Sequence, residues 1–339
     1  MKFHRLLVGF LLLTPVWLPG ANAGQEAQGL VLRPVHTFSI VARDPNTGEI
    51  GVAVQSHWFS VGSVVPWAEA GVGAVATQSF VDPVYGKLGL DLMRVGRSAP
   101  DALKSLLAGD AGRDVRQVAM IDAKGRVAAH TGKKCIAAAG DEVDAKRQFS
   151  TQANLMSNAS VWPAMAKAYR GSKGDIAEHL LAALEAAQAA GGDIRGRQSA
   201  AIIVVAAKST GRPWIDRRFD LRVEDSDHPI VELRRLVQRQ RAYQHMNAGD
   251  LAVEHGDFKR ANEEYSAAES LATDLVEIPF WAAVARANGG DLTGALPIFK
   301  QVFKREPRWL KLVPRLVDAG LLPADPKVAK AILREGRTH

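Results

Sequence analysis

Alternating apolar and polar residues near the start of the chain predict a β-hairpin. Strand-like runs occupy Thr37–Val41 and Ile50–Gln55, and the turn formers from Asp44 to Gly48 lie between them. The same periodicity predicts six later strands, at Gly73–Gln78, Gln117–Asp122, Val127–His130, Phe149–Leu155, Ala200–Ala206 and Phe219–Val223. Helical spacing of apolar residues predicts four helices among them, at Tyr85–Val95, Ala99–Ala108, Val161–Tyr169 and Ile176–Ala190.

The order of these elements predicts an α+β fold. Strands cluster early, helices occupy the middle, and strands return, which is not the strict alternation of a doubly wound parallel sheet. Turn sequences at Asp44–Gly48 and Ala123–Gly125 indicate antiparallel hairpins. We expect a four-layer αββα sandwich, in which helices cover two antiparallel sheets, over residues 37–240.

From about Ala242 the pattern becomes helical, and it repeats. Gly256, Asp257, Ala261 and Tyr265 recur as Gly290, Asp291, Ala295 and Phe299, each at an offset of 34 residues. This period is typical of tetratricopeptide repeats. We expect a tetratricopeptide-like domain at 241–339, capped by helices at Pro229–Gln244 and Pro307–Val317. The alternative is a generic helical bundle.

The first residues have the features of a secretory signal peptide. A basic start at Lys2 and Arg5 precedes the apolar stretch Leu6–Leu18, and small residues end it at Ala23. We expect residues 1–23 to be removed by cleavage after Ala23, which leaves residues 24–36 as a connector or propeptide. No later segment is apolar enough for a membrane span, so we expect a periplasmic or secreted protein without stable membrane insertion.

Composition narrows the classes of function. The chain has 339 residues and a net charge of +7. Its basic residues are spread out, which argues against nucleic-acid binding. Cys135 is the only cysteine, either a nucleophile or, as we favour, a packed thiol. The nine histidines show no metal-binding spacing and no phosphate-binding glycine motif is present, so we predict no metal and no cofactor.

Thr37 is the first candidate for chemistry. A threonine inside a chain is a poor nucleophile, but at a free N-terminus its own α-amine takes the hydroxyl proton. That amine has a pKa of about 7.7–8.0, so a useful fraction is unprotonated near neutral pH. Consecutive strands of a hairpin bring opposite ends together, so Gln55 and Ser56 should lie beside Thr37. The alternative for Ser56 is a strand-end serine bonded to solvent.

The richest polar cluster is the glycine-rich segment 191–199. Its three glycines let the backbone approach a ligand or take positive φ. Asp193 could hold an amine and Arg195 could clamp a carboxylate, while Gln198 and Ser199 open the next strand. The alternative is a helix C-cap with a surface ion pair.

Amide side chains on two predicted strands are further candidates. Gln152 and Asn154 share one strand face, and Gln78 ends another strand. A buried amide needs partners, which an oxyanion or a substrate amide would supply, although a core hydrogen bond would serve equally. Tyr85 follows a turn and lines a pocket or packs in the core.

Five motifs in order resemble the DUF1028 family: HTFSIVARDPNTGEIGVAVQS, VVPWAEAGVGAVATQSFVDPVYGKLGLDLM, STQANLM, GGDIRGRQSAAIIVV and RFDLRVEDSDHPIVELRRL. The resemblance covers about Thr37–Leu236. It implies the fold of N-terminal nucleophile hydrolases, in which a Thr, Ser or Cys heads the first strand, and by analogy amide-bond chemistry. In many relatives that threonine closely follows the initiator methionine. Here a second cleavage, between His36 and Thr37, is required.

We therefore expect a hydrolase of small polar amides with Thr37, Ser56 and Asn154 as catalytic residues. The predicted substrate-binding residues are Gln55, Gln78, Tyr85, Gln152, Asp193, Arg195, Gln198 and Ser199. The alternative is an inactive scaffold whose helical repeats bind a protein or peptide. A homo-oligomer is compatible with either function, and export also permits a cell-wall-associated module.

Overall fold

The predicted hairpin opens the fold. In the computed structural model, which describes residues 36–336, strand β1 (Thr37–Arg43) pairs antiparallel with β2 (Ile50–Ser56). The turn between them uses Gly48 at φ 76°, a left-handed conformation that glycine adopts without strain. The predicted signal peptide, its cleavage after Ala23 and nearly all of the connector lie outside the described residues, so export stays a prediction.

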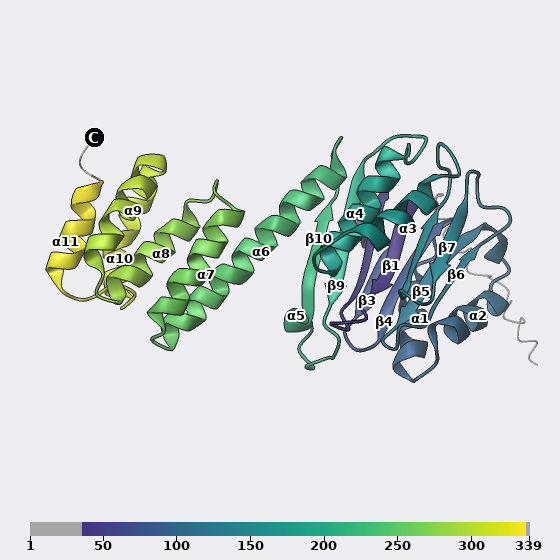
Figure 1. The fold of residues 1–339 in the computed structure, drawn as a ribbon, viewed down its shortest axis with the longest axis horizontal. Helices are drawn as coiled ribbons and strands as arrows, with labels where there is room; N and C mark the ends of the chain where they lie inside the picture. The colour runs from purple at the N-terminus through teal and green to yellow at the C-terminus, as the bar shows by residue number, and fades with distance from the viewer. Residues whose placement is uncertain (1–35, 337–339) are drawn as a thin grey trace, which may run out of the picture. The chain divides into compact units, whose positions relative to one another are not determined.

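The hairpin forms the centre of a six-stranded antiparallel sheet (Figure 1). Its order is β10-β9-β2-β1-β8-β7. The strands beside the hairpin are β7 (Gly140–Asp144), β8 (Phe149–Ala153), β9 (Ser199–Val205) and β10 (Arg217–Val223). The second sheet is antiparallel with order β3-β4-β5-β6, built from β3 (Pro66–Glu69), β4 (Gly73–Ser79), β5 (Arg116–Asp122) and β6 (Val127–Thr131).

Alternation along β1 separates two kinds of core. Phe38 and Ile40 point to an apolar core that they share with α3 (Val161–Gly171) and α4 (Ile176–Ala189). Ser39 lies on the opposite face and reaches Gln78 of the second sheet. On its other side the second sheet contacts α1 (Val84–Arg94) and α2 (Ala99–Gly109) through an apolar core of its own. The interior between the sheets therefore carries the polar residues.

The described chain ends in a run of helices. They are α6 (Pro229–Glu254), α7 (Phe258–Leu271), α8 (Glu277–Asn288), α9 (Leu292–Arg305), α10 (Leu312–Asp318) and α11 (Pro326–Glu335). Short helical turns occur at Val61–Ser63, Arg113–Val115, Pro213–Asp216 (α5) and Pro307–Lys311. Helix α6 runs through the predicted domain boundary at residues 240–241, and its first half adds Leu233 and Val237 to the core of the six-stranded sheet.

The offset of 34 residues is reproduced in the local structure of this helical region. Gly256 and Gly290 have φ of 73° and 87°. Each is followed by an aspartate that caps a helix, since Asp257 accepts a hydrogen bond from the backbone of Arg260 and Asp291 from that of Gly294. The aromatic positions Tyr265 and Phe299 are buried. Between residues 36 and 336, no helix combines the length and the apolar character that crossing a membrane requires.

Candidate active site

Strand pairing places Ser56 directly beside Thr37. The two residues are partners in the β1–β2 register, and Thr37 Oγ1 donates a hydrogen bond of 3.2 Å to Ser56 Oγ. Ser56 Oγ in turn donates to the main-chain carbonyl oxygen of His36 at 2.5 Å. Both side chains are buried. A chain of hydroxyl groups therefore leads from the candidate nucleophile to the carbonyl group that immediately precedes it.

Arg195 contacts the same carbonyl oxygen. Its Nη2 donates to the His36 oxygen at 2.9 Å and to Asp193 Oδ2 at 2.7 Å. Asp193 fixes the guanidinium further, because its Oδ1 accepts from Arg195 Nε at 3.0 Å. The Asp193 side chain has no exposed surface, whereas that of Arg195 is 28% exposed. A charged donor and a hydroxyl donor thus converge on one peptide oxygen.

Backbone conformation explains how the loop 191–196 reaches the end of β1. Gly191, Gly192 and Gly196 all have positive φ, at 117°, 60° and 120°, as the glycine-rich sequence predicts. Asp193 forms an isolated bridge with Met156, and Ser157 donates its N–H to Gly192. The loop is therefore anchored to the segment that follows β8.

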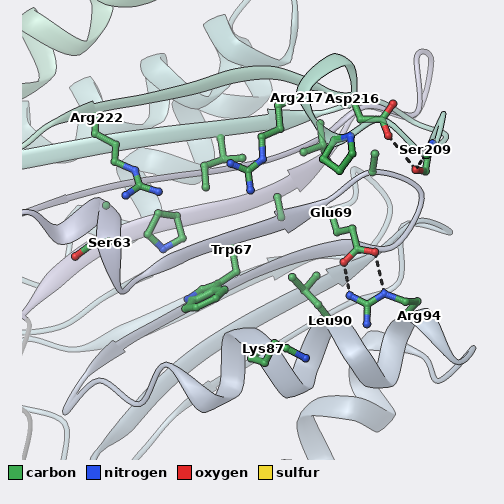
Figure 2. Close-up of a pocket in the computed structure, with 18 residues that line it drawn as sticks. Ser63, Trp67, Glu69, Lys87, Leu90, Arg94, Ser209, Asp216, Arg217 and Arg222 are labelled. Atoms are coloured by element: carbon green, nitrogen blue, oxygen red, sulfur yellow. Dashed lines mark hydrogen bonds and ion pairs between the residues drawn. The ribbon is translucent and has the colours of Figure 1, made fainter.

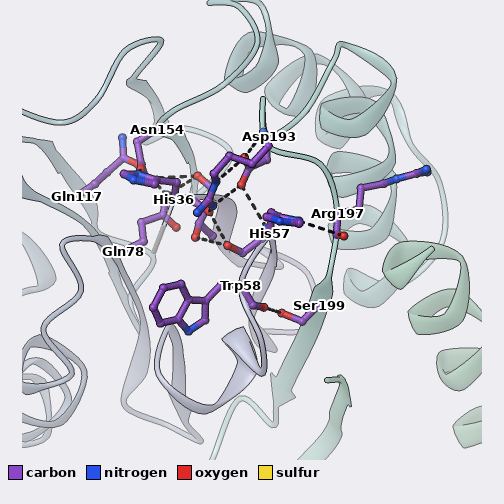
Figure 3. A network of polar contacts seen from close by, with 12 residues as sticks. His36, His57, Trp58, Gln78, Gln117, Asn154, Asp193, Arg197 and Ser199 are labelled. Carbon is purple, nitrogen blue, oxygen red and sulfur yellow. Dashed lines mark hydrogen bonds and ion pairs between the residues drawn. The ribbon is translucent and has the colours of Figure 1, made fainter. Parts of the chain in front are cut away.

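Three buried amides, Gln78, Gln117 and Asn154, lie together in the network of Figure 3, and two of them donate to the carbonyl group of Thr37. The Thr37 oxygen accepts from Gln78 Nε2 at 3.2 Å and from the backbone N–H of Asn154 at 3.1 Å. Gln117 Oε1 accepts from Gln78 Nε2 at 2.7 Å and from Asn154 Nδ2 at 2.9 Å. A buried network in which each amide is held by its neighbours keeps the head of β1 in one position.

The side chain of His36 is part of this network. It is 4% exposed, and its Nδ1 lies 2.9 Å from Asn154 Oδ1. An amide oxygen only accepts, so the ring nitrogen is the donor. Burial lowers the pKa of His36 below its usual range, which the hydrogen bond to Asn154 partly opposes. His36 is therefore held as a neutral imidazole near neutral pH.

Gln152 occupies the next position along the buried strand face. Its Nε2 donates to Ser39 Oγ at 2.6 Å, and Ser39 Oγ donates to Gln78 Oε1 at 2.6 Å. Gln152 is thus two residues further along the strand from the His36 carbonyl group than Asn154, and it supports the network through Ser39 and Gln78. The shared face expected for Gln152 and Asn154 is present, although β8 itself ends at Ala153.

Four predicted site residues lie outside the hydrogen-bond network around Thr37. Gln55 is paired with Phe38, so it points to the helix-covered face, opposite to Thr37. Gln198 Nε2 donates to Asp225 at 3.1 Å. Ser199 binds the loop after β2, through the carbonyl group of Trp58 and the N–H of Val61. Tyr85 donates to Asp110 at 2.9 Å, and burial raises the pKa of its phenol.

His36 and Gln117 are parts of the site that the sequence analysis missed. Gln117 begins a predicted strand and pairs with Gln78 in the β4–β5 register, so paired glutamines at one end of neighbouring strands were an available signal. The sequence marks His36 only as the residue before Thr37. His57 was also missed, and its N–H donates to Asp193 at 3.2 Å.

A separate cavity of about 430 Å³ is lined by none of the predicted site residues (Figure 2). Its labelled side chains include Trp67, Arg217, Arg222 and an ion pair between Glu69 and Arg94. The His36–Thr37 bond instead lies between two buried residues, and the His36 side chain contacts Asn154.

Cysteine and metal chemistry receive no support from the geometry. Burial raises the pKa of Cys135, whose Sγ lies 3.3 Å from the carbonyl oxygen of Arg116. Such a thiol is a weak nucleophile near neutral pH. Within the described part of the chain, no three His, Cys, Asp or Glu residues gather into a candidate metal site.

Comparisons with known proteins agree on the first part of the chain. The model of a family described as "Family of unknown function (DUF1028)" matches residues 37–233, a match that begins at Thr37. The crystal structure of protein SPO2555 from Silicibacter pomeroyi, which carries the same family designation, is similar with a TM-score of 0.54 and 32% sequence identity. That similarity covers 60% of this chain and 88% of the other. No curated protein matches the chain.

The chain is thus a mixed α/β protein with two antiparallel sheets and a cluster of buried polar residues at the start of β1. The chain belongs to the DUF1028 family.

Proposed function

We propose that this chain is an N-terminal nucleophile hydrolase that acts on linear amide bonds of small polar molecules after it has cleaved its own His36–Thr37 bond. The observation that carries the proposal is the convergence of Thr37, Ser56 and Arg195 on the His36 carbonyl group. Helices outside two facing antiparallel sheets support it, because this is the αββα arrangement of such hydrolases.

The self-cleavage uses groups that are already in contact. Thr37 Oγ1 attacks the carbonyl carbon of His36, and its proton passes to Ser56 Oγ as the Ser56 proton moves to the carbonyl oxygen. Arg195 stabilises the partial negative charge on that oxygen until the proton from Ser56 arrives. The bond from the His36 carbon to the Thr37 nitrogen then breaks as the proton on that oxygen transfers to the nitrogen and the carbonyl group re-forms. The product is an ester between His36 and Thr37 Oγ1.

Water then hydrolyses this ester, which releases the His36 carboxylate and leaves Thr37 with a free amine. In later turnovers that amine accepts the Thr37 hydroxyl proton, and the oxygen attacks a substrate amide. The leaving amine departs with the proton, and water hydrolyses the acyl ester. Ser56 and Arg195 would hold the substrate oxyanion as they hold the His36 oxygen.

Turnover by the chain that begins at Thr37 tests this function. Every described helix and strand lies after His36, so this chain contains all of them. It should release amine from members of a panel of small N-acyl amides, and hydroxylamine should intercept the acyl ester as a hydroxamate. Release at the same rate by Thr37→Ala would show that Thr37 is not the nucleophile.

A second function is supported by a cavity in the helical region, which we propose to be tetratricopeptide-like. The cavity measures about 320 Å³ and is lined by Asp250, Glu254 and Trp281 among others. Two carboxylates beside an indole suit a lysine or arginine side chain of a bound peptide. Calorimetric binding of a lysine-rich peptide should weaken in Trp281→Ala, and a Thr37→Ala chain that still binds it would separate this function from hydrolysis.

A further inference from the structure

The contacts of His36 mark the acyl side of the proposed active site. When Thr37 Oγ1 attacks the His36 carbonyl carbon, everything on the His36 side of that carbon is the acyl group of the reaction. In a later turnover Thr37 Oγ1 attacks the substrate, and Ser56 and Arg195 donate to the substrate carbonyl oxygen. The acyl group of the substrate therefore takes the place of His36. This inference rests on the proposed function: the residue at position 36 then indicates which acyl groups the site binds.

The Asn154 side chain determines which hydrogen-bonding group the acyl group must carry. Asn154 is fully buried, and its Oδ1 lies 2.9 Å from Nδ1 of His36. The orientation of this amide is fixed, because its Nδ2 donates to Gln117 Oε1 at 2.9 Å and to the Thr37 oxygen at 3.4 Å. Reversing the amide would place its nitrogen against the imidazole N–H and its oxygen against two acceptors. Asn154 therefore presents an acceptor to the acyl group.

The orientation of Gln117 is also fixed, and it in turn fixes that of Asn154. Its Nε2 donates to Thr131 Oγ1 at 2.9 Å and to the carbonyl oxygen of Ala153 at 2.9 Å, so its Oε1 must face Asn154 and Gln78. These partners belong to the folded strands and stay in place when His36 departs. The departure then leaves Asn154 Oδ1 as an acceptor that faces the space His36 vacates, where a substrate donor can replace the lost hydrogen bond.

The geometry of histidine defines the donor that fits. Nδ1 of His36 is bonded to Cγ, and in asparagine the amide nitrogen is also bonded to Cγ. We infer that the acyl subsite selects acyl groups that carry a neutral N–H donor on the γ carbon, as histidyl and asparaginyl amides do. A leucyl group has a similar size but no donor, and an aspartyl group presents a carboxylate oxygen to the Asn154 oxygen.

Four matched substrates test the inference on the chain that begins at Thr37. This chain is obtained by self-cleavage or by placing only an initiator methionine before Thr37. The substrates are the p-nitroanilides of N-acetyl-asparagine, N-acetyl-histidine, N-acetyl-leucine and N-acetyl-aspartate. We expect kcat/KM for the first two to exceed that for the last two by about 10-fold or more. Asn154→Leu should shrink this ratio.

The precursor supplies an independent readout. His36→Asn should cleave itself at a rate close to that of the unchanged chain, whereas His36→Leu and His36→Asp should be slower by about 10-fold or more. Equal rates for all four residues, together with equal kcat/KM for the four anilides, would overturn the acyl preference and leave the proposed function standing. If neither self-cleavage nor any hydrolysis that depends on Thr37 occurs, even of p-nitrophenyl acetate, both fall.

Discussion

Arg195 donates from Nη2 to the main-chain carbonyl oxygen of His36 at 2.9 Å. The contact links a loop after α4 to the peptide bond that precedes the first strand. A charged donor on a peptide oxygen withdraws electron density from the carbonyl carbon and prepares it for attack. Ser56 adds a second donor from the neighbouring strand, and these two contacts are the basis of the proposed cleavage ahead of Thr37.

Removal of the charged donor should slow self-cleavage. Arg195→Met deletes the guanidinium that faces the His36 oxygen, and we expect the first-order rate to fall about 10²–10³-fold. Intact-mass measurements over time give that rate. Arg197→Met is the matched control, since Arg197 is an exposed arginine of the same loop. Equal rates in the two variants would remove Arg195 from the mechanism.

A comparison of Ser56 with Ser199 distinguishes a catalytic role of the Ser56 hydroxyl from a role in stability alone. Ser56 and Ser199 are partners on neighbouring strands and both are buried. Only Ser56 contacts Thr37 and the His36 oxygen, whereas Ser199 holds the loop after β2. Ser56→Ala should slow self-cleavage about 10²-fold, by the usual effect of losing one oxyanion donor. Ser199→Ala should lower the thermal midpoint while cleavage continues, and the reverse pattern would contradict the assignment.

Asp193 should act by positioning Arg195. Asp193→Asn replaces a carboxylate oxygen by an amide that faces the donors of Arg195, so we expect slower cleavage and a loss of about 1–3 kcal/mol in the free energy of unfolding. Urea denaturation and intact mass measure the two effects. Asp220→Asn, which alters a partly exposed ion pair with Arg217, should leave cleavage unchanged.

The burial of His36 predicts a pH dependence of stability in the uncleaved Thr37→Ala chain. The folded pKa of His36 lies below 6.5, so the unfolded chain binds the proton first as the pH falls. The contribution is complete above about pH 6.5 and is lost as the pH falls toward the folded pKa. Adding His36→Asn should flatten the decline in urea midpoint over this range. An unchanged decline would mean that His36 does not titrate there.

The helix turns of the repeated pattern should respond alike to substitution. Gly256 and Gly290 have positive φ and open space where a Cβ would lie, so Gly256→Ala and Gly290→Ala should each cost about 1 kcal/mol through backbone strain alone. Gly109→Ala also meets open space, but without a positive φ, and it should not destabilise the fold. Thermal unfolding checks all three, and a large difference between Gly256 and Gly290 would count against equivalent turns.

The sequence predicted those parts of the fold that depend on local pattern. The first hairpin follows from alternation and from the turn at Asp44–Gly48, and both are present. Strands β3 and β7 were missed for physical reasons. β3 has four residues and starts at Pro66, and β7 has the polar sequence GDEVD, so neither shows the usual alternation. Their pairing comes from neighbouring strands that local sequence does not reveal.

The site also contains residues that local sequence predicts and residues that depend on tertiary packing. Ser56 follows from hairpin geometry, and Arg195 from a glycine-rich loop, so both could be predicted. The role of Gln117 depends on which strands of the two sheets face each other, and that arrangement is set by tertiary packing. Gln55 was predicted as a site residue because it lies next to Ser56 in the sequence. Side chains alternate along a strand, however, so that of Gln55 points away from Thr37.

The mass and N-terminal sequence of the purified chain show whether the His36–Thr37 bond is cleaved. The full chain should lose every residue up to His36 and begin at Thr37. The Thr37→Ala chain, produced in the same way, should keep the bond between residues 36 and 37. A full chain that stays intact at this bond during prolonged incubation, or a Thr37→Ala chain that is cut there at the same rate, would contradict the account.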